Sequence, residues 1–368
     1  MLLSALFACS EPCGAANSGS PDSATETGSD SAPSDSAIGA AAGHFRLHGA
    51  TVVGLGLADV EIEGARIVAV GAAAVAGEVI DLTGRWLVPA FIDSHVHLAY
   101  DPRGEELATG GVAGAVDLAA PVAFLAASHG PIQLIASGPM ITAPAGYPTR
   151  GWGRNGYGME CSSGDDAVAA VDVLIDAGAG VIKLPITTGP QLDAAAQTGV
   201  VARAHARGVK VASHALSDVD AAAAALAGVD VLAHTPTEPL SATTLRSWSS
   251  GAVVSSLLAF GGGADTVANL SALRGAGARV LYGTDFGNTR TAGIDPGEIA
   301  LMMQAGLDGA AILAAGTSAP AAYWGFADLG EITVGKAASL LVLAQDPMSD
   351  PATLASAEQV WIDGVRRR

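Results

Sequence analysis

Basic side chains, aromatic side chains and cysteines are all scarce in this chain of 368 residues. Lysine and arginine number 18 against 36 aspartates and glutamates, so the net charge is −18. A surface this acidic repels phosphate backbones, which argues against nucleic acid as a partner. The three cysteines, Cys9, Cys13 and Cys161, show no paired spacing, and this excludes a disulfide framework or a Cys-x-x-Cys site.

The chain also lacks an apolar run long enough to cross a bilayer. Its short N-terminal apolar run ends at Cys9, similar to a bacterial lipoprotein signal but without basic residues before it. Residues 10–43 are rich in Ser, Asp and Gly, which is typical of a disordered tether. We therefore expect residues 1–9 to be a signal and the protein to be an exported lipoprotein, periplasmic or at the cell surface, whose membrane contact is a lipid anchor. If Cys9 follows the apolar run by chance, the expectation is a cytoplasmic protein.

The chain is rich in alanine and glycine, and short apolar runs alternate with alanine-rich helical stretches. Such repeated units indicate an α/β fold with a parallel sheet. Eight units close naturally as a (β/α)8 TIM barrel, which we place at residues 85–329. The eight expected strands are centred on Phe91–Leu98, Gly114–Ala119, Ile132–Gly138, Val181–Ile186, Lys210–Ala215, Val231–Thr235, Ala252–Leu257 and Val280–Asp285.

Both flanks of this region have a different sequence pattern. Short β-rich runs separated by glycines fill Phe45–Leu82, and similar runs recur at Ala338–Leu343 and Gln359–Val365. We expect the two flanks, residues 44–84 and 330–368, to form one small β-sandwich-like domain beside the barrel.

Polar residues that bind metals or titrate stand at the ends of five predicted strands, where barrels of this type build active sites. Strand alternation places the first two histidines of this set on one side, and buried imidazoles need a partner such as a metal or a hydrogen bond. Six such groups in a chain with eight histidines favour the metal. The set is His95, His97, Lys183, His214, His234 and Asp285.

The connection from Ile141 to Gly164 is unusually long for a barrel, and such loops are often functional. We expect Tyr147, Arg150, Arg154 and Tyr157 in this loop to contact substrate, with the arginines binding a carboxylate. The alternative is that these side chains pack the loop or face solvent.

The segment from Gly84 to His97, which reads GRWLVPAFIDSHVH, resembles the first-strand motif of the amidohydrolase superfamily. Gly283-Thr284-Asp285 and the segment from Gly335 to Leu340 are also similar to that superfamily, and the resemblance covers nearly all of the chain after residue 45. Within it, the chain looks closest to the imidazolonepropionase-like and Xaa-Pro dipeptidase-like branch.

The resemblance implies a role for each residue of the set. His95, His97 and Asp285 would bind the more buried metal, and His214 with His234 would bind a second one. Lys183 would be carboxylated by carbon dioxide and become a bridging carbamate. Two Zn2+ ions fit this mixture of nitrogen and oxygen ligands, with manganese and iron as alternatives.

The expected chemistry is hydrolysis of an amide or peptide-like C–N bond by a metal-bridging hydroxide, with Lys183 and Asp285 as catalytic residues and Asp285 as proton shuttle. The expected partner is a small-molecule substrate, such as a peptide or an N-acyl amino acid. The alternative functions are those of a mononuclear deaminase, an imidazolonepropionase-like cyclic amide hydrolase, a lactonase or esterase, or a non-catalytic tethered surface protein. The sequence leaves the oligomeric state open.

Overall fold

The computed structural model describes residues 43–72 and 74–368. The predicted signal, the tether up to residue 42, Cys9 and Cys13 lie outside these residues. Cys161 is buried and free. Among the helices of the described part, none combines the length and the hydropathy of a membrane span.

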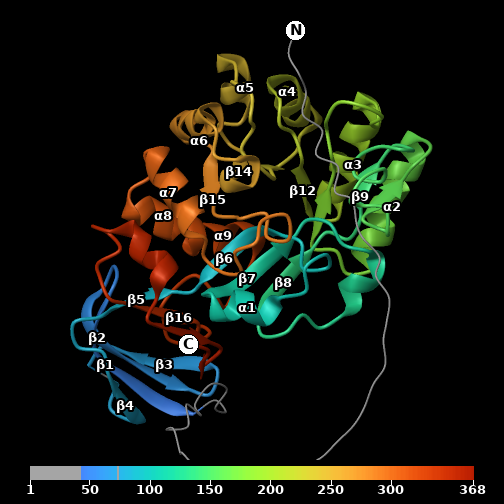
Figure 1. Cartoon of the computed structure of the whole chain (residues 1–368). Coiled ribbons are helices and arrows are strands. Elements are labelled where there is room, and N and C mark those ends of the chain that lie inside the picture. Colours follow the sequence, from blue (N-terminus) through green and yellow to red (C-terminus); the bar gives the residue numbers. More distant parts are fainter. Residues whose placement is uncertain (1–42, 73) are drawn as a thin grey trace, which may run out of the picture. The chain divides into compact units, whose positions relative to one another are not determined.

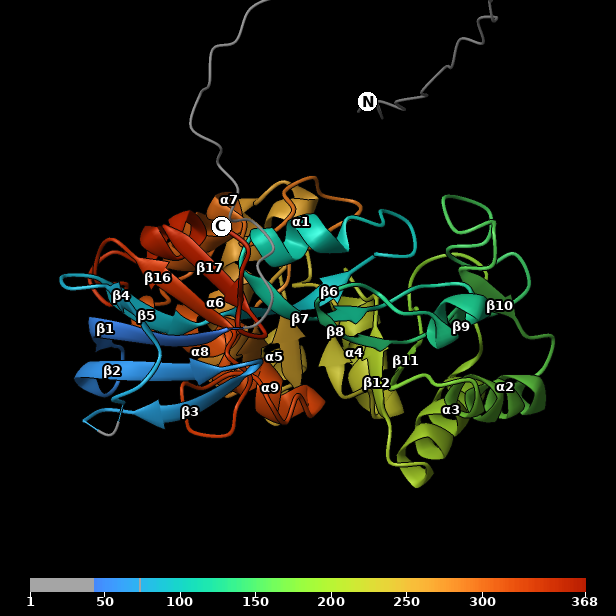
Figure 2. The same ribbon diagram turned by 90° about the horizontal axis from the view of Figure 1, so that it is seen from below.

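The two flanks of the described chain meet in one eight-stranded sheet, shown in blue and red in Figures 1 and 2. β5 joins them, because it pairs in parallel with β1 and antiparallel with β16. A single sheet therefore replaces the predicted sandwich-like arrangement, and it takes in β5, which lies beyond the predicted boundary at residue 84. The strands are β1 (His44–Val52), β2 (Gly56–Glu63), β3 (Arg66–Val70), β4 (Glu78–Asp81), β5 (Trp86–Pro89), β16 (Leu340–Leu343), β17 (Gln359–Ile362) and β18 (Val365–Arg366).

Between the flanks lie two parallel sheets. One has the order β6-β7-β8 and the other runs β11-β12-β13-β14-β15. Each observed strand overlaps one of the eight predicted ones. The predicted alternation of strands and helices in this region is therefore confirmed. The strands are β6 (Phe91–Val96), β7 (Val112–Asp117), β8 (Gln133–Ala136), β11 (Val181–Lys183), β12 (Lys210–Ser213), β13 (Val231–Leu232), β14 (Ala252–Val254) and β15 (Arg279–Leu281).

Backbone hydrogen bonds connect the edges of these two sheets. Gly180 N donates to Ala136 O, which links the start of β11 to β8. On the other side, Ser94 N on β6 donates to Tyr282 O, just after β15. The chain beyond β15 then stays beside β6, since Val96 forms a parallel bridge with Phe286.

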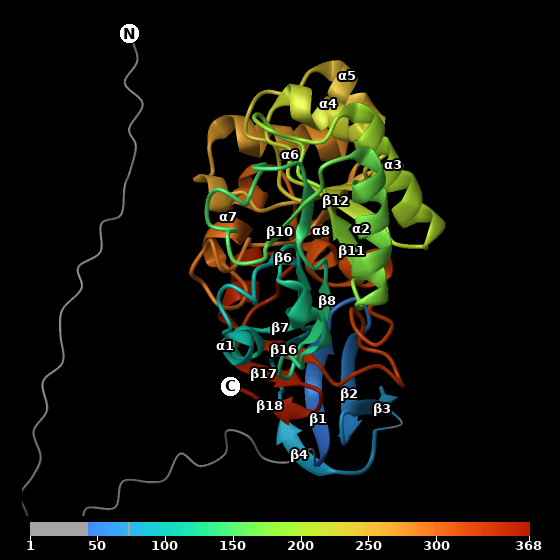
Figure 3. The same ribbon diagram turned by 90° about the vertical axis from the view of Figure 1, so that its right-hand side faces the viewer.

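Helices follow most of these strands and cover them from outside (Figures 1 and 3). Several begin at a side chain that accepts a backbone N–H, for example Ser163 before α2 and Asp193 before α3. A two-stranded parallel sheet, β9 (Met140–Thr142) with β10 (Gly158–Glu160), frames the long loop. The helices are α1 (Gly104–Thr109), α2 (Gly164–Asp176), α3 (Ala194–Ala206), α4 (Asp218–Ala227), α5 (Ala242–Ser247), α6 (Ala264–Ala276), α7 (Pro296–Gln304), α8 (Gly309–Gly316) and α9 (Ser318–Trp324), with the 3-10 turns η1 (Val122–Ala126), η2 (Leu258–Phe260) and η3 (Pro351–Ser356).

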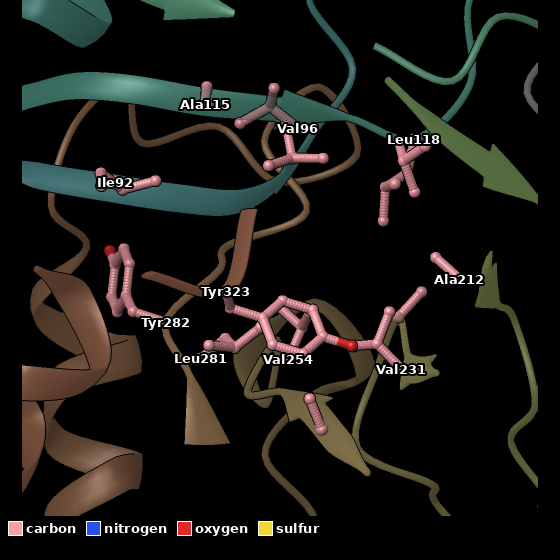
Figure 4. Packing of buried hydrophobic residues seen from close by; sticks show 14 of the residues in the cluster. Ile92, Val96, Ala115, Leu118, Ala212, Val231, Val254, Leu281, Tyr282 and Tyr323 are labelled. Carbon is pink, nitrogen blue, oxygen red and sulfur yellow. The ribbon is translucent and has the colours of Figure 1, made fainter. Parts of the chain in front are cut away.

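One core cluster holds side chains of both parallel sheets. Figure 4 shows Ile92 and Val96 of β6 across a shared apolar space from Val231 and Val254, and all four are fully buried. Burial of each such side chain stabilises the fold by roughly 1.5–3 kcal/mol. This packing joins the two parallel sheets. The polar residues described next lie at or just after the ends of their strands.

Candidate metal centre

The six residues predicted to bind metal converge on one cavity of about 350 Å³. His95 lies on β6 and Lys183 ends β11, while the other members lie within four residues of the ends of their strands. All six are buried although they are polar. The members are His95, His97, Lys183, His214, His234 and Asp285.

His95, His97 and Asp285 form the tightest group, with one potential ligand atom from each within 4.8 Å of the others. The Nε2 atoms of the two histidines lie 3.2 Å apart. Asp285 Oδ1 is 3.0 Å from His97 Nε2 and 3.5 Å from His95 Nε2. His95 Nδ1 lies 2.8 Å from Ala233 O, so it carries the proton and donates to that carbonyl, and Nε2 is left with a lone pair.

Burial favours the neutral form of three imidazoles in this cavity. It lowers the pKa of His214 to about 3 and the pKa values of His95 and His234 well below their usual range, with Lys183 acting in the same direction on each. Asp285 is the opposite case. Burial acts to raise its pKa, but the neighbouring His95 and His97 hold it at about 2, so this carboxylate is ionised at neutral pH.

Lys183 is fully buried, and its Nζ has no hydrogen-bond partner among the described residues. Burial lowers the pKa of this amine to about 7, against the attraction of Asp285 and Asp117. Two further buried nitrogens, His97 Nδ1 and His234 Nδ1, also have no partner in the described part of the chain. Buried polar nitrogens without a partner are unfavourable in a protein interior. A bound metal ion would compensate for such unpartnered groups in this cavity.

A second layer of polar contacts holds the ligand group in place. Asp93 accepts hydrogen bonds from the backbone N–H of His95 at 3.0 Å and of Thr284 at 3.1 Å, and from the Thr284 hydroxyl at 2.6 Å. These bonds join β6 to the segment after β15. Sequence reasoning missed Asp93 as a site residue, although strand alternation places it on the same side as His95 and His97.

Two backbone features accompany the position of Asp285 beside His95 and His97. Gly283 passes so close to β6 that a Cβ there would lie 3.1 Å from His95 N, and it would also collide with Val254. Asp285 itself has a φ of 56°, in the left-handed region that favours glycine. Strain of this kind persists where surrounding contacts enforce it, and it is common at functional sites.

Aromatic rings form the wall of the cavity around the imidazoles. The Tyr147 ring stacks on His214 with centroids 4.7 Å apart, and Trp152 meets His97 edge-on at 5.1 Å. Phe260 of η2 meets His234 edge-on at 4.8 Å. Tyr147, which we expected to contact substrate, lines the cavity, whereas no sequence signal distinguished Phe260.

Three residues of the predicted substrate set do not line the cavity. Arg150 and Arg154 are exposed, and Arg154 Nη2 donates to the Arg150 carbonyl. Tyr157 is buried in the base of the loop, where its hydroxyl donates to Ala99 O at 2.9 Å. From this loop, Tyr147 and Trp152 line the cavity. Arg150, Arg154 and Tyr157 thus lie outside the lining of this cavity, and their contact with substrate stays a prediction.

Comparison with known proteins agrees with this site. The profile of the amidohydrolase family matches residues 86–366, which is most of the chain. The chain belongs to the amidohydrolase family. A search of curated protein sequences gave no match.

Solved structures of amidohydrolases share the fold. A Xaa-Pro dipeptidase with bound methionine superposes with a TM-score of 0.75 at 19% identity, covering 88% of this chain and 99% of the other. A prolidase complexed with N-methylphosphonate-L-proline gives 0.69 at 19%, covering 88% and 99%. Phenylurea hydrolase B gives 0.71 at 19%, covering 88% and 96%. These likenesses establish the α/β fold, and the family membership supports a hydrolase.

Proposed function

We propose that the protein is a metal-dependent hydrolase that cleaves a carbon–nitrogen bond of a small molecule. One observation carries the proposal: neutral imidazoles, an ionised aspartate and an unpartnered buried lysine converge on a single cavity. Nitrogen and oxygen donors in this combination suit Zn2+, and Mn2+ or Fe2+ would fit the same donors. The family membership and the hydrolases among its structural relatives are consistent with this chemistry.

His95, His97 and Asp285 would hold one metal ion, and His214 with His234 a second. Lys183 would join them as a carbamate. At a pKa near 7 a sizeable share of this amine is neutral at physiological pH, and its lone pair can attack carbon dioxide. A nitrogen–carbon bond forms, one proton leaves to solvent, and the product is a carbamate anion whose charge the divalent metal ions would balance.

Divalent metal ions at such a site lower the pKa of water and polarise a carbonyl oxygen. The chain's own residues supply the proton transfer and the orientation. Asp285 is ionised and can accept a proton and return it to the leaving nitrogen. Asn288 Nδ2 donates to Asp285 Oδ1 at 3.1 Å and so orients the carboxylate. The rings of Tyr147 and Phe260 exclude bulk water from the same space.

The finer architecture is part of the proposal. We infer that the two parallel sheets form one (β/α)8 barrel within residues 85–329 and that the flanking sheet, which includes β5, is a small domain appended to it. The hydrogen bonds from Gly180 to Ala136 and from Ser94 to Tyr282 support closure, since they join the sheets at both edges.

Metal content tests the proposal most directly. The full chain, expressed with zinc and bicarbonate, should contain about two metal ions per chain by elemental analysis. Lys183→Ala should reduce this to one or fewer and remove any dependence on bicarbonate. Arg154→Ala, an exposed change in the nearby loop, is the matched control and should keep the wild-type content. One metal per wild-type chain would favour a mononuclear hydrolase or deaminase, and none in a folded sample would refute the proposal.

A further inference from the structure

Tyr147 of the long loop brings a phenol hydroxyl to the cavity of the candidate ligands. The indole Nε1 of Trp152 donates a hydrogen bond to the Tyr147 oxygen at 3.1 Å. An indole N–H can only donate, so this bond occupies one side of the phenol oxygen and leaves the hydroxyl hydrogen to point elsewhere. Among the described residues, that hydrogen has no acceptor. The hydroxyl is therefore a donor that a ligand in the cavity can use.

Both rings of this pair are held against candidate metal ligands. The Tyr147 ring stacks on His214 with centroids 4.7 Å apart and 22° between the two planes. Trp152 lies edge-on to His97, with centroids 5.1 Å apart. His214 and His97 would bind different metal ions, so the pair reaches from one ligand group to the other. The hydroxyl is thus in place before a substrate arrives, which is what makes a hydrogen-bond donor effective in catalysis.

The backbone of the loop supports this position. Gly153 N donates to Pro148 O at 3.2 Å, and this tight turn brings the indole back beside the phenol. Gly146 passes so close to the segment after β11 that a Cβ there would lie 2.7 Å from Pro190 O. Any larger residue at this position would displace the backbone that carries Tyr147.

We propose that Tyr147 is a catalytic residue whose hydroxyl donates a hydrogen bond to the substrate carbonyl oxygen as that oxygen gains negative charge, and that Trp152 positions this hydroxyl. The inference rests on the proposed function for the reaction itself. A carbonyl oxygen has two lone pairs, so it can accept from Tyr147 and still face a metal ion. Because the phenol oxygen already accepts from the indole, its O–H group is the stronger donor. A phenol keeps its hydrogen at neutral pH, so no proton is transferred in this contact.

Methylphosphonate, a small tetrahedral anion whose oxygens mimic a carbonyl oxygen under attack, measures this donation without turnover. Calorimetry on the zinc-loaded full chain should give a Kd about tenfold higher for Tyr147→Phe than for the wild type, because a hydrogen bond to a charged oxygen is lost while the ring remains. The zinc content should not change. Tyr100→Phe is the matched control, since Tyr100 is 48% exposed and its ring lies 6.0 Å from that of Trp152. This control should keep the wild-type Kd, and an equal loss there would overturn the inference.

A double-mutant cycle tests the positioning role of Trp152. Trp152→Phe keeps an aromatic ring beside His97 but removes the N–H group, and it should raise the Kd for methylphosphonate about threefold to fivefold. Combined with Tyr147→Phe it should cause no further loss, because the indole acts through the phenol hydroxyl. A side chain that only fills space would give additive losses, and that result would overturn the role of Trp152.

The same titration on the metal-free chain separates this inference from the proposed function. If the protein retains no zinc but Tyr147→Phe still weakens methylphosphonate binding, the hydrolase proposal fails and Tyr147 stands as a donor to an anionic oxygen. Equal Kd values for the zinc-loaded wild type and Tyr147→Phe would overturn the inference. A wild type that binds methylphosphonate in neither form would overturn it as well.

Discussion

Glu298 on α7 is a buried carboxylate whose removal should affect both stability and the cavity wall. Its Oε1 accepts the backbone N–H of Leu257 at 3.0 Å and its Oε2 accepts that of Leu258 at 2.8 Å. These bonds hold the start of η2, which carries Phe260 to its place beside His234. Glu298→Gln keeps the size of the side chain but replaces one acceptor oxygen with an amide nitrogen, which cannot accept from the second N–H. The expected loss from that unpaired group is about 1–3 kcal/mol.

The pH dependence of this loss has a definite sign. Burial raises the pKa of Glu298 from 4.5 to about 7, so between these values the folded state holds a proton that the unfolded chain releases. Wild-type stability from this group is present below pH 4.5 and lost as the pH rises through 7, by roughly 2–3 kcal/mol between pH 5 and pH 8. Glutamine does not titrate, so the variant escapes that loss. The destabilisation by Glu298→Gln should therefore be larger at pH 5 than at pH 8 by about this amount.

Urea unfolding followed by circular dichroism at the two pH values measures both quantities. The exposed Glu331→Gln serves as the matched control, and surface changes of this kind usually alter stability by less than about 0.5 kcal/mol. A difference between wild type and Glu298→Gln that stays constant from pH 5 to pH 8 would refute the reasoning.

Three other changes probe the ligands, their support and the N-terminus. Asp285→Asn should lower kcat by about 100-fold or more while the melting temperature stays close to wild type, and full activity in this variant would exclude Asp285 as the proton carrier. Asp93→Ala leaves the N–H groups of His95 and Thr284 unpaired, so unfolding should become easier by about 3 kcal/mol. The same change should weaken metal binding by about tenfold to 100-fold in a competition titration with a chelator, and an unaltered metal affinity would contradict the supporting role of Asp93. Cys9→Ser should abolish incorporation of labelled palmitate in a bacterial host, whereas persistent labelling would show that Cys9 is not the lipidated residue.

The polar set was predictable because local rules cover it. Alternation along a strand puts His95 and His97 on one side, and parallel strands of consecutive units present their ends together. Lys183 and His214 needed only a correct strand assignment to be placed there. The positions of all eight central strands were predictable from the short apolar runs that alternate with helical stretches.

The direction in which the loop side chains point was not predictable in this way. Arg150 and Arg154 stand in a loop with many glycines, and nothing local specifies that Trp152 and Tyr147 face inward while the arginines face solvent. Phe260 meets His234 from η2, whose start is held by Glu298 of α7. The pairing of β5 with β16 likewise joins segments about 250 residues apart.

Residue order therefore determined which groups could do chemistry here and where each would stand along its strand, since these depend on spacing and on the strand period. Folding determined which charge and which rings surround those groups, because side chains in loops take their direction from packing against distant parts of the chain. The contact of Phe260 with His234 is a fact of that second kind, because it depends on the backbone N–H groups by which Glu298 holds η2.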